Sequence, residues 1–179
     1  FWPKFIKHND LAKWQNGDIA FIDANLALGS CSSVQDFSQN YKIQPKKEHQ
    51  SYHWMEVAVT LFGVMFKLRV EDLHASFFDG GEEEKQSLLK FLHDSGIDPA
   101  IIEVEWHIVS EDLIHDAASV QWVNDEITTP WLHSVGNFNV HLVYSDGAPQ
   151  HFKLTSIAYW ISTQKVKHGT LMDWNYRGT

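Results

Sequence analysis

The chain has 179 residues, enough for one domain with a substantial core, and its hydrophobic fraction of 44% excludes a disordered protein. The 14 Lys and Arg against 23 Asp and Glu give a net charge of −9, which disfavours binding to nucleic acid. With one cysteine, Cys31, an internal disulfide is excluded, and no apolar run reaches the ~18 residues that a transmembrane helix needs. We therefore expect a soluble cytoplasmic protein with a single domain over residues 1–179.

The first part of the chain, about residues 1–43, reads as a helical segment. Pro3 suits a first helical turn, apolar residues recur at helical spacing up to Trp14, and Gly17 is the expected stop. The stretch 18–28 is compatible with either helix or strand. Ser33 is the expected cap of a short helix that extends to Tyr41.

Residues 54–70 predict a β-hairpin with Phe62-Gly63 as its loop. This register sets Val57 opposite Leu68 and places the apolar side chains on one face. The opposite face then pairs Glu56 with Arg69. A continuous helix is the competing interpretation, and the Val, Thr and Phe content with a central Gly disfavours it.

A helix follows, with Asp79 as the expected N-cap and Gly96 as the stop. Leu88, Leu89 and Leu92 predict a buried stripe along it. Residues 101–109 alternate in polarity and predict a strand.

After this strand, Ser110 is the expected cap of a short helix over about 111–118, and residues 120–131 show no regular pattern. Residues 137–161 predict a second hairpin with its turn at 146–149. The tail from Gly169 is compatible with an ordered cover or a frayed end. Together these elements predict an α+β domain: a curved antiparallel sheet built from the hairpins at about 54–70 and 137–161 plus the strand 101–109, with helices packed on one face.

The distribution of charge is the most specific functional signal. No Lys or Arg lies between Lys90 and Lys153, and that stretch holds ten acidic residues. A field of one sign speeds the encounter with a partner of the opposite sign, and Trp residues often anchor an interface. We therefore expect a basic protein partner, bound by residues of this stretch: Glu103, Glu105, Glu111, Asp112, Asp116, Trp122, Asp125 and Glu126.

An enzyme is the alternative hypothesis. Glu103, Glu105 and His107 share one face of a strand at ~6.6 Å steps, where they could bind a metal or transfer protons in a pocket. Asn139 and His141 could join them. The solvent-exposed face of an amphipathic strand explains the same pattern. We favour this interpretation over that of a small-molecule enzyme or metal-dependent hydrolase.

No familiar catalytic or cofactor motif is present. The sequence has no phosphate-binding glycine loop, no dinucleotide fingerprint and no paired cysteines, so no cofactor and no metal are predicted. Cys31, without an evident His partner, is expected to be inert. The function that we expect is a non-catalytic, acidic binding or inhibitor-type protein that occludes a basic partner, as immunity proteins and phage inhibitors do. A third option is a structural subunit that docks through its aromatic ends.

Overall fold

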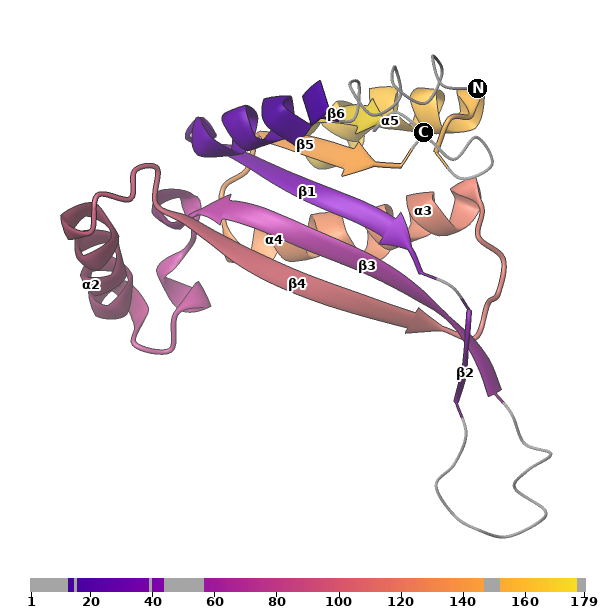
Figure 1. Cartoon of the computed structure of the whole chain (residues 1–179), viewed down its shortest axis with the longest axis horizontal. Helices are drawn as coiled ribbons and strands as arrows, with labels where there is room; N and C mark the ends of the chain where they lie inside the picture. Colours follow the sequence, from indigo (N-terminus) through magenta and orange to yellow (C-terminus); the bar gives the residue numbers. More distant parts are fainter. Residues whose placement is uncertain (1–12, 15, 39, 44–56, 147–151, 177–179) are drawn as a thin grey trace, which may run out of the picture.

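A computed structural model describes residues 13–14, 16–38, 40–43, 57–146 and 152–176 (Figure 1). Residues 16–24 are helical. The strands are β1 (Ser30–Phe37), β2 (Tyr41–Ile43), β3 (Val57–Arg69), β4 (Ile101–Ser110), β5 (Val140–Ser145) and β6 (Leu171–Tyr176). The helices are α2 (Gly81–Asp94), α3 (Ala117–Val123), α4 (Thr129–Val135) and α5 (Thr155–His168), with short turns η2 (Val70–Asp72) and η3 (Ala75–Phe77) and a π-helical segment η4 (Asn124–Thr128).

The fold is α+β, as predicted, but its six-stranded sheet is mixed and not curled, which corrects the expected curved antiparallel sheet. β3 lies between β4 and β1, and β2 pairs with the first residues of β3. These three pairings of β3 are antiparallel, whereas β1–β5 and β5–β6 are parallel. Parallel neighbours need a crossover connection, which α5 supplies between β5 and β6 (Figure 1).

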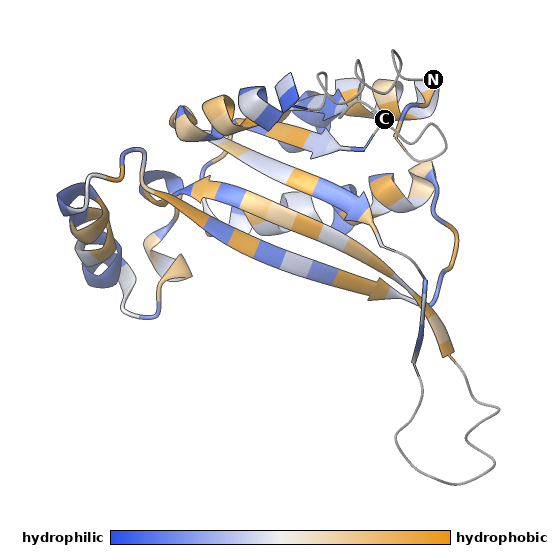
Figure 2. Ribbon diagram, viewed as in Figure 1, coloured by the Kyte–Doolittle hydropathy of each residue, from blue (hydrophilic) through white to orange (hydrophobic). Residues whose placement is uncertain are grey.

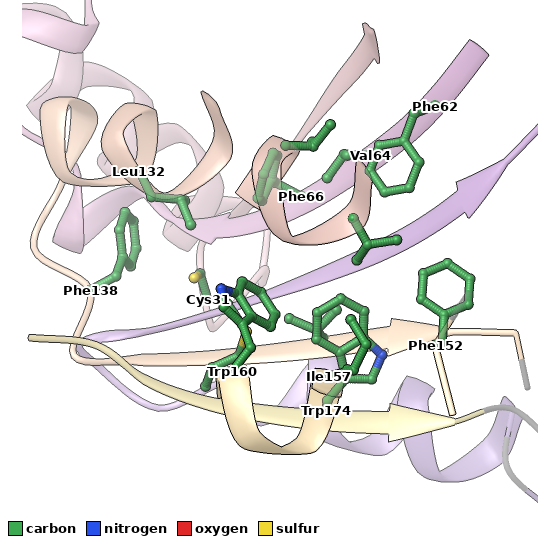
Figure 3. Packing of buried hydrophobic residues seen from close by; sticks show 14 of the residues in the cluster. Cys31, Phe62, Val64, Phe66, Leu132, Phe138, Phe152, Ile157, Trp160 and Trp174 are labelled. Atoms are coloured by element: carbon green, nitrogen blue, oxygen red, sulfur yellow. The ribbon is translucent and has the colours of Figure 1, made fainter. Parts of the chain in front are cut away.

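One face of the sheet builds the core. Hydrophobic and hydrophilic side chains alternate along β3 and β4 (Figure 2), and the inward set packs against α3, α4 and α5. Trp160 of α5 lies against Trp174 of β6 with ring centroids 6.0 Å apart (Figure 3). Phe66 of β3 packs 5.0 Å from Trp131 of α4. Several of the Trp residues thus belong to aromatic clusters of the core.

The predicted hairpin at 54–70 is wrong. From Val57 to Arg69 the chain is one strand of 13 residues, and residues 54–56 lie outside the described part. A loop at Phe62-Gly63 would have exposed Phe62, which is instead 2% exposed and faces the core. The strand can continue because β1 supplies the antiparallel partner that the sequence pattern had assigned to the second half of the hairpin.

The second predicted hairpin, 137–161, is also wrong beyond its first strand. β5 occupies residues 140–145, but residues 155–161 are helical in α5, and the turn residues 147–149 lie outside the described part. Ile157, Trp160 and Gln164 are buried at helical spacing, and packing of Ile157 and Trp160 in the core outweighed the β-rich composition. Gly169 ends α5 at φ 78° and the tail forms β6.

Several shorter predictions are corrected too. Residues expected as a helix after Ser33 form β1, and Gly17 lies inside the helical stretch 16–24. The helix expected at 111–118 begins only at Ala117, and the irregular stretch 120–131 is helical. β1 forms because β3 and β5 supply its partners, whereas α3 begins at Ala117 because Asp116 caps it.

The strand predicted at 101–109 is confirmed as β4, and the helix after residue 79 as α2. The N-cap of α2 is Gly80, whose N–H donates to Glu84 Oε2 (2.7 Å), and not Asp79. The Leu stripe is not buried as predicted, because none of the fourteen residues of α2, all of them described, is buried. α2 instead lies beside one end of the sheet (Figure 1).

Candidate functional site

The ten acidic residues of the Lys- and Arg-free stretch do not gather in one place. Asp94 and Asp98 lie near α2 at one end of β4, and Glu111 and Asp112 follow its other end (Figure 1). A strand of ten residues separates the two groups by ~33 Å. The partner surface expected from the whole stretch is therefore divided.

Asp125 is held by α5 of the same chain. Its carboxylate accepts from Lys167 Nζ (2.8 Å), Trp160 Nε1 (3.1 Å) and Gln164 Nε2 (3.2 Å). Burial alone would raise the pKa of Asp125, but these hydrogen bonds outweigh burial and hold the pKa below its usual value. Asp125 therefore fastens α5 to η4, while its neighbour Glu126 is exposed.

Glu103, Glu105 and His107 lie on the open face of β4. Their side chains are 62%, 67% and 57% exposed, and Glu103 contacts Lys67 of β3 at 3.5 Å. His107 Nε2 lies 3.4 Å from Glu105 Oε1. These groups line a solvated surface, whereas the enzyme hypothesis needs them in a pocket.

The two residues that the enzyme hypothesis would add are not beside them. Asn139 is exposed, and His141 is 1% exposed on the core side of β5. His141 Nε2 lies 2.8 Å from Ser33 Oγ, a pair without solvent access. Cys31 is fully buried, and burial, together with the Asp72 carboxylate, raises the pKa of its thiol. His141, Ser33 and Cys31 are therefore closed to a substrate in this conformation.

A cavity of about 280 Å³ lies where β4 ends and α3 begins. Its deep side is apolar, with Phe62 of β3 and Val123 of α3, both buried. Its rim carries Asp112, Asp116 and Trp122, three of the eight residues predicted to bind a partner. The structure thus brings together one subset of the predicted site, and we call this cavity and its rim the β4–α3 pocket.

The loop between β4 and α3 is ordered by its own short side chains. Asp112 N–H donates to Ser110 Oγ, and Ile114 N–H donates to Asp112 Oδ1, both at 3.0 Å. Asp116 caps α3 by accepting from Ser119 N–H at 2.8 Å. These bonds set both carboxylates at the rim, where the positive end of α3 favours the charge of Asp116.

Four residues of the pocket region carried no signal in the sequence. The His115 ring stacks on Phe37 with centroids 4.5 Å apart and planes 9° apart. His115 Nε2 lies 2.7 Å from Asn40 Oδ1 and 3.2 Å from Thr60 Oγ1. Residues from β1, β3 and the loop meet here only after folding, so no local pattern could have indicated them.

The surface around the pocket is apolar and exposed. Trp122 is 58% and Ile114 63% exposed, and both line the pocket. In the described part of the chain, no ion pair involves Glu111, Asp112 or Asp116. The rim therefore combines large exposed hydrophobic groups with carboxylates that no cation of the described residues neutralises.

Comparison with known proteins adds one match. A family model described as "Domain of unknown function (DUF8701)" matches residues 18–78, about a third of the chain, from the first helix through η3. No curated protein and no solved structure matches the chain. Across the described residues, no helix has the length and apolar character needed to cross a membrane. The matched residues form part of the sheet. They do not include the loop between β4 and α3, which carries the acidic residues of the rim.

Proposed function

We propose that this protein binds a basic segment of a partner protein, with an apolar side chain of that segment seated in the β4–α3 pocket. The observation that carries the proposal is the exposed Trp122 and Ile114 beside Asp112 and Asp116, two carboxylates without an ion pair among the described residues. Large aromatic anchors supply affinity at such sites, and the surrounding charge selects the partner and speeds the encounter. The net charge of −9 adds a long-range attraction for cationic proteins.

The size of the pocket favours a side chain over a small metabolite. Its 280 Å³ lies just below the ~300–1,000 Å³ typical of small-molecule sites. A Leu or Phe of a docked segment would bury its apolar surface against Phe62 and Val123, while Lys or Arg beside it would meet Asp112 and Asp116. Binding of this kind would cover the basic surface of the partner, which is the occluding action expected from the sequence.

The test is a selection with peptides displayed on phage, followed by affinity measurements on synthetic copies of those selected. We expect selected peptides to carry Lys or Arg on both sides of a Leu, Ile or Phe. Their Kd should rise with salt concentration, because salt screens the attraction. Trp122→Ala should weaken binding by ~30-fold, equivalent to ~2 kcal/mol, the loss typical of an interface anchor.

Matched variants separate this site from general acidity. Asp112→Asn and Asp116→Asn remove charge but retain an oxygen for the local hydrogen bonds, so they should weaken binding without loss of fold. Tyr159→Ala, at an aromatic residue 74% exposed on α5, and Glu105→Gln on β4 should leave Kd unchanged. Equal effects of the two sets, or selected peptides without basic residues, would refute the proposal.

A further inference from the structure

A second cluster of side chains, at the opposite end of β4 from the pocket, has the chemistry of a metal site. Glu71 of η2, His93 of the last turn of α2 and Asp98 of the loop before β4 converge there. Each offers one donor atom, and the three donor atoms lie within 4.8 Å of one another. We propose that these three residues bind a divalent transition-metal ion of the Zn²⁺ type.

The donor set indicates the class of ion. One imidazole nitrogen with two carboxylate oxygens suits Zn²⁺, whereas Mg²⁺ and Ca²⁺ prefer oxygen ligands alone. Three protein ligands with water as the fourth would complete a tetrahedron. In such a tetrahedron, with bonds of ~2.0–2.1 Å, the donors lie ~3.3 Å apart, so the side chains must close by up to ~1.5 Å.

The surroundings allow this closure. His93 and Asp98 are exposed, so their side chains can turn without disturbing the core. Glu71 is held in place by Arg69, whose Nη2 lies 2.9 Å from Glu71 Oε1. Arg69 is fixed in turn through Nη1 to the carbonyl of Leu26 (2.8 Å). A carboxylate has about four lone-pair positions, so Glu71 can accept from Arg69 and still bind a metal ion.

The position of His93 gives the ion a structural consequence. Helix α2 has no buried residue, and Lys85 fastens it to η2 by donating to the carbonyls of Glu71 (3.0 Å) and Leu73 (2.6 Å). A cation beside the last turn of α2 meets the negative end of the helix dipole, which favours binding. A metal ion shared by His93 and Glu71 would join the end of α2 to the sheet.

The simpler explanation is that His93 and the two carboxylates lie near one another without binding any metal. Zinc titration of the full chain, followed by calorimetry and by hydrogen exchange of α2, distinguishes the two. We expect one equivalent of Zn²⁺ to bind, to raise Tm as its concentration rises, and to slow exchange in α2, with EDTA reversing both effects. Binding should be lost or weakened at least ~10-fold in His93→Ala and in Asp98→Asn.

His107→Ala is the matched control, because it removes another exposed imidazole that lies beside a carboxylate, Glu105. This variant should bind Zn²⁺ as the native chain does. Absence of saturable binding, or equal affinity in His93→Ala and the native chain, would overturn the proposal. Circular dichroism shows whether each of the two cluster variants is folded. If one variant misfolds, the zinc affinity of the other still tests the proposal. The outcome is independent of peptide binding at the β4–α3 pocket.

Discussion

At the scale of single residues, the core of this protein holds polar pairs that are satisfied internally. Gln35 of β1 and Asn124 of η4 exchange two amide hydrogen bonds, both of 2.9 Å, and both residues are 0% exposed. Thr128 Oγ1 also donates to Asn124 Oδ1 at 3.0 Å. Such pairs avoid the cost of ~1–3 kcal/mol that each unpaired buried polar group carries, and they fix how η4 packs on β1.

The buried His141 predicts a specific dependence of stability on pH. Burial lowers its pKa from 6.5 to about 3, so between these values the unfolded chain binds a proton that the folded chain does not. The free energy of unfolding should therefore fall as the pH drops below 6.5, by up to ~1.4 kcal/mol per pH unit from this residue. His141→Gln retains a polar partner for Ser33 but does not titrate.

We expect the native chain to lose up to ~2 kcal/mol more than His141→Gln between pH 7 and pH 5 in urea unfolding. The comparison cancels the other titrating groups, which the two proteins share. His107→Gln, at an exposed position, controls for the substitution itself. An identical pH dependence in native and His141→Gln proteins would show that His141 is not buried in neutral form.

At the scale of elements, the space around two glycines predicts how the fold responds to a larger side chain at each position. A Cβ at Gly63 would meet nothing closer than Asp36 O at 3.9 Å, an ordinary contact, as expected in the middle of a continuous strand. A Cβ at Gly136 would lie 2.6 Å from Phe138 Cε2 and 2.8 Å from Asp72 O. The first site therefore accepts a methyl group, and the second does not.

Gly63→Ala should raise the free energy of unfolding by ~0.5–1 kcal/mol, because alanine loses less conformational freedom in a strand. Gly136→Ala should lower it by ~1–3 kcal/mol through overpacking. Urea unfolding of both variants provides the measurement. Destabilisation by Gly63→Ala would instead favour the hairpin turn that the sequence had indicated at this position.

At the scale of the whole molecule, stability should be graded from the centre of the sheet to α2. The amides of β3 bond to β1 on one side and β4 on the other, whereas α2 buries no residue. Native-state hydrogen exchange should show β3 opening only by global unfolding and α2 opening at least ~2 kcal/mol more easily. Equal exchange free energies in β3 and α2 would mean that the helix unfolds with the sheet.

The sequence alone sufficed for features set by local periodicity and composition. These were the α+β class, helix α2, strand β4 and the outward face that Glu103, Glu105 and His107 share. In each case the signal lies within one element, where side-chain period and end-capping glycines act over a few residues. The acidic rim was also visible in part, because Asp112, Asp116 and Trp122 belong to one short stretch of chain.

The tertiary structure decided everything that depends on partners distant in the chain. The apolar run around Gly63 is compatible with a hairpin or a single strand, and only β1, which lies against it, selects the strand. The same holds for the β4–α3 pocket, where β1 and β3 bring Phe37 and Thr60 to the loop, and for the cluster of Glu71, His93 and Asp98. Contacts of this kind arise from burial of surface between elements, a free energy that no local pattern encodes.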